Sequence, residues 1–259
     1  MKESKFPWRF KRTRRTRGQS IVELALMAPI LLIILSGLFE FGFIFQHYLA
    51  VLDSARNAAR FSSDSQYDIR DGDPDCDELV DGTVTQDFYR QTACLAVAEL
   101  TLEQPTIELC LPGMLGPNCS TDWVDMDDVV VSAFSVMRVG GDEIKRFPVD
   151  SFDVSLEKGW SYACDLQFFI DGSCTQFNDS FRTGMHSTAF TTARIKSMLE
   201  PGAPSTGYIL VEVKYHYHQI LALPWFTQFV ENPIPFNIYA FWPLVSAEPT
   251  STAKASPTP

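Results

Sequence analysis

The 259-residue sequence has few basic residues outside its first 18 positions, because eight of its 21 lysines and arginines lie there, leaving 13 against 31 acidic residues. Such an acidic chain is not, taken as a whole, a nucleic-acid binder. Its 14 glycines and 16 prolines follow no period, which excludes collagen. No P-loop, dinucleotide fingerprint or internal repeat is present. The 46% share of hydrophobic residues is typical of a folded protein.

Cysteine is absent from the first 75 residues, and the six cysteines all follow: Cys76, Cys94, Cys110, Cys119, Cys164 and Cys174. An even count confined to one part of the chain favours disulfides in an oxidising compartment. Zinc is the alternative, but no pair has CxxC spacing. Of the 15 full pairings that six cysteines allow, pairing in order avoids threading the chain, and it predicts bridges Cys76–Cys94, Cys110–Cys119 and Cys164–Cys174.

The basic head, residues 1–18, is followed by an apolar run in which Leu24 to Phe39 carry no charge. As a helix, Leu24 to Phe45 rises about 33 Å, the thickness of a bilayer core. The alternative is a buried core helix of a soluble protein. The eight upstream cations favour a membrane helix with its N-terminus in the cytoplasm. A cleaved secretory signal is the other alternative, and it would carry a cleavage site of the pattern small residue, any residue, small residue after the apolar run. No such site follows here, so we expect an uncleaved anchor or one cleaved upstream of its apolar segment.

The rest of the sequence predicts a body of mixed helices and strands. The first helix continues past the membrane with a small-residue face formed by Val51, Ala55, Ala58 and Ser62. Further helices are predicted at 85–100 and 187–200, and strands at 106–111, 128–139, 143–149, 208–219 and 234–244. The predicted fold class is α+β, with a long N-terminal transmembrane helix followed by an extracytoplasmic domain built on an antiparallel sheet. The expected divisions are a basic leader (1–18), the helix (19–62), the α+β domain (63–245) and a disordered tail (246–259).

Two groups of residues have some of the features of metal sites. Residues 71–78 begin with the D-x-D-x-D pattern of a calcium loop, but Cys76 stands where an EF-hand needs glycine and Gly82 where it needs glutamate. A solvated acidic loop is therefore favoured. His216 and His218 alternate on one predicted strand and would share a face, but no third ligand can be named.

The sequence also has one partial catalytic motif. Gly159-Trp160-Ser161 begins like a nucleophile elbow, but residue 163 is alanine where the motif needs glycine. We therefore assign no catalytic residue, metal or cofactor, and predict that the protein is not an enzyme.

The stretch RGQSIVELALMAPILLIILSGLFEFG resembles the TadE-like family, the pseudopilin-type proteins of bacterial tight-adherence (Flp) pilus systems. The matching positions are Gly18, Val22, Glu23, Ala25, Pro29, the leucine-rich run, Gly37 and Glu40-Phe41-Gly42. The family commonly continues with an Ala/Arg-rich helical stretch, and SARNAAR follows here at 54–60. The resemblance covers about 45 residues.

The resemblance implies that a prepilin peptidase cuts between Gly18 and Gln19 on the cytoplasmic face. Glu23 would then be the fifth mature residue and would pair with the N-terminal ammonium of a neighbouring subunit, because each charge alone is costly within a membrane. The sequence departs from many prepilin-like sites at Leu24, where those sites have an aromatic residue.

The leading hypothesis is a minor pseudopilin-like protein that acts in assembly of a tight-adherence pilus or secretion system. It would cross the cytoplasmic (inner) membrane once, with the N-terminus inside and the C-terminal domain outside. Its partners would be other pilin-like subunits, pilus assembly proteins, prepilin peptidase and membrane lipid, and not nucleic acid. The alternatives are a single-pass receptor or adhesin with a ligand-binding outer domain, and an anchored hydrolase, for which no catalytic constellation is found.

Overall fold

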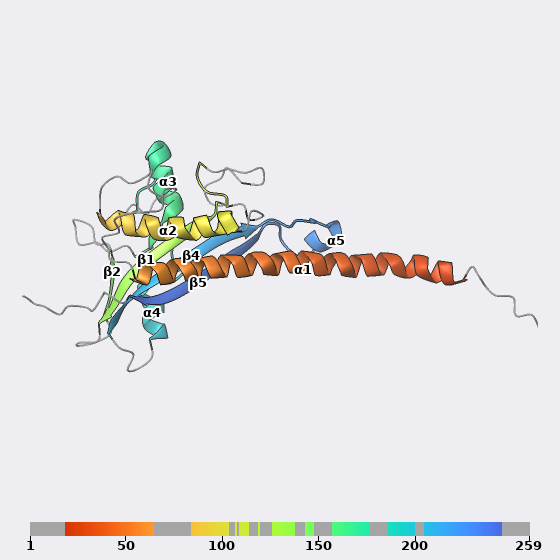
Figure 1. Ribbon diagram of the computed structural model, residues 1–259, viewed down its shortest axis with the longest axis horizontal. Coiled ribbons are helices and arrows are strands. Elements are labelled where there is room, and N and C mark those ends of the chain that lie inside the picture. Colours follow the sequence, from red (N-terminus) through yellow and green to blue (C-terminus); the bar gives the residue numbers. More distant parts are fainter. Residues whose placement is uncertain are drawn as a thin grey trace, which may run out of the picture. The chain divides into compact units, whose positions relative to one another are not determined.

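The structure is a computed structural model that describes residues 19–64, 84–103, 107, 109–113, 119, 126–137, 143–147, 157–176, 186–199 and 205–244. The chain divides into two compact units, Met1–Gly42 and Phe43–Pro259. Its fold class is α+β, as predicted: a long apolar helix precedes a domain of mixed helices and an antiparallel sheet (Figure 1). The predicted leader and the predicted tail lie outside the described residues.

Helix α1 (Gln19–Asp64) is 46 residues long and contains Pro29. Its leucines, alanines and other good helix formers sustain the helix, and a single proline removes only one backbone donor from it. The helix ends at Asp64, two residues beyond the predicted bound at 62, where the sequence becomes rich in aspartate, serine and glycine.

The C-terminal part of α1 packs against α2 (Val84–Glu103), which confirms the helix predicted at 85–100. The predicted small-residue face is buried in this contact, with Ala55 fully buried and Ser62 1% exposed. The Ser54 hydroxyl donates to the Ala96 carbonyl oxygen over 2.7 Å, and the Ser62 hydroxyl lies 2.7 Å from that of Thr92. Small residues let the helices approach closely enough for these short polar side chains to reach the facing helix.

The sheet has the strand order β2-β1-β4-β5, and every pairing in it is antiparallel. Its strands are β1 (Asp128–Met137), β2 (Glu143–Phe147), β4 (Thr206–Tyr217) and β5 (Ile234–Leu244), all at predicted positions. A two-residue strand, β3 (Trp160–Ser161), pairs with β1 beside β2. The edge strand β5 contains Pro235 and Pro243, which is tolerated because an edge strand has one unpaired side.

Side chains alternate between the two faces of the sheet. Val131, Val211 and Val213 belong to the larger core, which also contains buried residues of α1 and α2. Phe134 and Leu210 lie on the other face, in a smaller core with Phe190 and Ile195. The short helix α4 (Thr192–Met198) contributes Ile195 to this second core.

The strand predicted at 106–111 is wrong for the residues that the structure describes there. Ile107, Leu109 and Cys110 form no strand, and Leu111 forms only an isolated bridge. Their apolar side chains are buried, as in a strand. However, the Cys110 backbone bonds to Asp127, 17 positions away: its N–H donates to the Asp127 carboxylate over 2.7 Å, and its carbonyl accepts from the Asp127 N–H over 2.9 Å.

The helix predicted at 187–200 is shorter than expected, because α4 begins at Thr192. The preceding residues are held irregular by the buried Glu212 carboxylate, which accepts from the Thr188 hydroxyl and from the Ala189 N–H. Thr191 caps the helix, since its hydroxyl accepts from the Arg194 N–H over 3.3 Å.

The structure contains the disulfides Cys110–Cys119 and Cys164–Cys174, which are two of the bridges that pairing in order predicts. Cys94 is also disulfide-bonded, and its predicted partner Cys76 lies outside the described residues. The second bridge closes around a helix that was not predicted from the sequence, α3 (Tyr162–Asp171). The Ser161 hydroxyl caps its start, and Gly172, with φ of 71°, ends it in the left-handed conformation.

The buried small-residue face predicts the effect of overpacking. Ala55→Leu adds three carbons at a fully buried position and should lower the free energy of unfolding by about 1–3 kcal/mol. Chemical denaturation of the detergent-solubilised protein, followed by near-UV circular dichroism, measures this change. Arg56→Leu is the matched control, because that side chain is 58% exposed on the same helix. Equal destabilisation by both changes would contradict the packing described.

Non-reducing peptide mapping tests the cysteine connectivity. We expect linked peptides for Cys110–Cys119 and Cys164–Cys174, and a third for the predicted pair Cys76–Cys94. Detection of a Cys94–Cys110 peptide, or of free thiols throughout, would show that the sequential scheme is wrong.

Candidate functional site

The first part of α1 presents apolar side chains all around the helix. Leu24, Leu32 and Leu38 are 66%, 65% and 63% exposed, and most large residues from Ile21 to Phe41 are similar. An exposed apolar surface of this extent needs apolar surroundings. The helix is also long and apolar enough to cross a membrane. A single N-terminal helix with these properties indicates a membrane anchor.

The predicted processing and assembly residues lie at the start of this helix. Gln19 is the first residue of α1, and Gly18 lies outside the described residues. Glu23 is exposed on the helix surface among Val22 and Leu24, which are themselves exposed. Glu23 lies four positions after Gln19, which places the two positions about one helical turn apart.

These features define a class of protein: one apolar N-terminal helix of the membrane-anchor type, continuing into an α+β body that contains disulfides. Residues 18–60 match the family described as TadE-like protein, in agreement with the resemblance seen in the sequence. The match spans the apolar part of α1 and most of its small-residue face. It associates the chain with tight-adherence pilus systems, in which TadE-like proteins are generally non-enzymatic. No curated protein and no solved structure is significantly similar to the chain.

Two buried aspartates at the start of β1 form a polar centre in the body. The Asp128 carboxylate accepts from the Ser161 hydroxyl over 2.6 Å and from the Ala163 N–H over 2.9 Å. The ring Nδ1 of the fully buried His186 lies 3.1 Å from it. Asp127 accepts from the Cys110 N–H and, over 2.7 Å, from the His216 N–H. These bonds join β1 to α3, to the end of β4 and to the segment containing the Cys110–Cys119 bridge.

This geometry gives Ser161 a structural role. Its hydroxyl donates to Asp128 and accepts from the Cys164 N–H over 3.0 Å, and the residue is fully buried. A nucleophilic serine needs an exposed hydroxyl with a base in reach. The partial nucleophile elbow of the sequence is therefore a strand-to-helix junction in which Ser161 caps α3.

Of the two candidate metal sites, the structure describes only the one formed by His216 and His218. The His216 ring lies 3.0 Å from an Asp127 oxygen, and β4 ends at Tyr217, so His218 lies beyond the strand. Among the described residues there is no group of three histidine, cysteine, aspartate or glutamate side chains that could hold a metal ion. The acidic stretch 71–78 lies outside the described residues.

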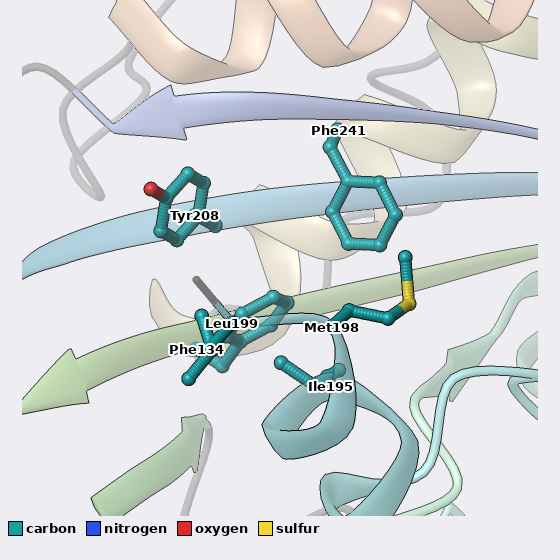
Figure 2. Close-up of a pocket in the computed structure, with 6 residues that line it drawn as sticks. All are labelled: Phe134, Ile195, Met198, Leu199, Tyr208 and Phe241. Carbon is teal, nitrogen blue, oxygen red and sulfur yellow. The ribbon is translucent and has the colours of Figure 1, made fainter. Parts of the chain in front are cut away.

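A shallow apolar hollow lies on the α4 side of the sheet (Figure 2). Its volume is about 160 Å³, and its lining residues are Phe134, Ile195, Met198, Leu199, Tyr208 and Phe241. Ligand pockets are usually larger, about 300–1,000 Å³, and combine apolar walls with a few placed polar groups. This hollow has a wholly apolar lining surface, so it lacks the groups that would orient a ligand.

Glu212 and Arg146 lie buried on the same side of the sheet. Burial raises the pKa of Glu212, against the opposing effects of the hydrogen bonds from Thr188 and Ala189. Burial likewise lowers the pKa of Arg146, against the attraction of Glu157. The Arg146 guanidinium donates to the Phe190 carbonyl and, over 3.2 Å, to the Thr192 hydroxyl. These contacts fix the irregular segment before α4 onto the sheet.

The raised pKa of Glu212 predicts a pH-dependent stability difference. The folded chain keeps this proton to higher pH than the unfolded chain, so its contribution to stability is present at low pH and is lost as pH rises through the folded pKa. Glu212→Gln cannot ionise and should escape this loss. Its stability relative to wild type should rise with pH between the ordinary glutamate pKa and the raised one, by about 1.4 kcal/mol per unit of pKa difference.

Urea denaturation of both proteins across that pH range measures the difference. Glu157→Gln is the control, because it removes a carboxylate whose side chain is 59% exposed. A Glu212→Gln difference that is independent of pH, or that falls as pH rises, would contradict the prediction.

Proposed function

We propose that this protein is a membrane-anchored minor pseudopilin-like component that acts in assembly of a tight-adherence (Flp-type) pilus or secretion system. The observation that carries the proposal is that residues 19–60, nearly all of the stretch 18–60 that matches the TadE-like family, belong to one continuous helix. That helix has an apolar exposed part containing Glu23 and a small-residue part that packs into the body. We propose no catalytic chemistry for the protein.

The proposed topology places residues 1–18 in the cytoplasm, α1 across the cytoplasmic (inner) membrane and the body outside. The eight basic residues of the head support this direction by the positive-inside rule. The disulfides of the body also support it, because such bridges persist in oxidising compartments. Prepilin peptidase would then reach the bond between Gly18 and Gln19 from the cytoplasmic side.

Glu23 is the residue to which we assign an assembly role. A carboxylate in a membrane helix is costly to insert unless it finds a proton or a cation. The ammonium freed at Gln19 of a neighbouring subunit would supply that cation at the same depth in the membrane. Pairing of this ammonium with the Glu23 carboxylate would fix the depth of the subunit in the membrane relative to its neighbour.

The alternative function, a receptor or adhesin with a ligand-binding outer domain, needs a ligand pocket. The apolar hollow near α4 gives it little support, because it is small and its lining surface is apolar throughout. We therefore assign the body to contacts with other pilin-like subunits and pilus assembly proteins.

Processing is the first test of this function. Mass spectrometry of the protein extracted from membranes of cells with an active prepilin peptidase should identify Gln19 as the first residue. Co-expression without the peptidase should leave Met1–Gly18 attached. An intact leader in the presence of the active enzyme would refute the processing step.

Substitution of Glu23 tests the assembly role. Glu23→Gln should leave membrane insertion intact but reduce co-purification with the pilus machinery, by about tenfold if the lost pairing contributes about 1.4 kcal/mol. Glu23→Asp keeps the charge and should restore part of the loss. Asp53→Asn is the control, because Asp53 lies on the same helix outside the apolar run and its side chain is 68% exposed. Equal effects of Glu23→Gln and Asp53→Asn would argue against a specific ion pair.

A further inference from the structure

The connection between β4 and β5 contains an uncharged apolar loop, residues 219–230, with the sequence QILALPWFTQFV. Phe229 is 86% exposed, and Ile220 and Leu221 are 50% and 40% exposed. Trp225 and Phe226 form the short helix α5 (Pro224–Thr227) with their neighbours and are half-buried. An exposed cluster of large apolar side chains on a folded domain marks a surface that meets something apolar.

This loop has a defined shape that holds these side chains outward. Three hydrogen bonds from the buried Gln219 hold the two ends of the loop together. Its backbone N–H donates to the Asn232 side-chain oxygen over 3.1 Å, and its side-chain amide donates to the carbonyls of Val230 and Glu231. Around α5, the N–H groups of Thr227 and Val230 donate to the Leu223 and Phe226 carbonyls. Phe229 is therefore exposed on a loop whose backbone is held in place by hydrogen bonds.

The position of the loop in the body relates it to the anchor. The ring of Tyr217, the last residue of β4, lies 4.9 Å from the ring of His47 in α1. At the start of β5, the Phe236 ring lies 6.0 Å from that of Tyr48. The apolar run of α1 ends at Phe45, two residues before His47. The loop thus leaves the end of the sheet at which Tyr217 and Phe236 contact α1, a few residues after Phe45.

We propose that residues 219–230 form a second membrane contact, which inserts Phe229 and its apolar neighbours into the outer headgroup region of the bilayer that α1 crosses. This inference rests on the membrane anchoring in the proposed function. Tryptophan and phenylalanine are the residues that favour this interfacial region. Because the loop carries no charge, the contact depends on apolar burial and requires neither anionic lipid nor low salt. It would orient the body on the membrane before the subunit joins a pilus.

Fluorescence quenching by lipid tests this contact in the full chain reconstituted into phosphatidylcholine vesicles. Three separate variants, Phe229→Cys, Met198→Cys and Leu31→Cys, each carry an environment-sensitive NBD probe. Leu31 reports on the anchor, and Met198, which is 54% exposed on α4, is a matched apolar control. Gln228→Cys replaces Phe229→Cys if that variant does not form the native disulfides.

We expect a lipid nitroxide near the headgroup to remove about half of the emission at position 229 and little at position 198, at low and high salt alike. A deeper nitroxide should quench the probe at position 31. Water-like, unquenched emission at 229 with quenching at 31 would overturn the loop contact and leave the anchor standing. A blue-shifted but unquenched probe at 229 would show that protein covers the loop, which also overturns it. Loss of quenching at 31 would refute the anchor itself.

Discussion

The packing of the small-residue face of α1 against α2 joins the anchor helix to the body. One helix must meet two surroundings: its first part is apolar on every side, whereas its last part buries alanines and serines on one face and keeps charged residues such as Arg56 on the other. Hydrogen bonds from Ser54 and Ser62 to α2 fix the position of one helix along the other, which apolar burial alone would not specify. Because α2 in turn covers the sheet, this seam connects the apolar run to the main core.

The body depends on buried acids to hold the parts of the chain that do not belong to regular elements. Asp127 and Asp128 bind the backbone near Cys110, the start of α3 and the end of β4, and Glu212 binds the segment before α4. Each acid is buried, and a buried carboxylate is tolerated only when donors surround it. The Cys110–Cys119 bridge acts on one of these irregular segments, the one whose backbone Asp127 also binds.

Elements set by local pattern could be predicted from the sequence, and elements set by distant partners could not. The apolar run of α1, the small-residue face at Ala55 and the alternation in β4 each follow from residue spacing. The bridges Cys110–Cys119 and Cys164–Cys174 agree with pairing in order. The strand predicted at 106–111 failed because Asp127 binds the backbone of Cys110 from 17 positions away, and the early start of the helix at 187 failed because Glu212 captures Ala189. The polar centre joins residues up to 89 positions apart, which no local signal reveals. Helix α3 did carry a signal, the serine and glycine that flank it.

The two prolines of β5 limit how the sheet can grow. Pro235 and Pro243 lie eight positions apart on an edge strand, so their missing N–H groups belong to the same alternate set along the strand. A proline is tolerated in an edge strand where its missing N–H would face away from the neighbouring strand. We therefore expect both prolines to remove a donor from the side of β5 that faces away from β4, one near each end of the strand. The edge is therefore blunted against β-augmentation and edge-to-edge aggregation.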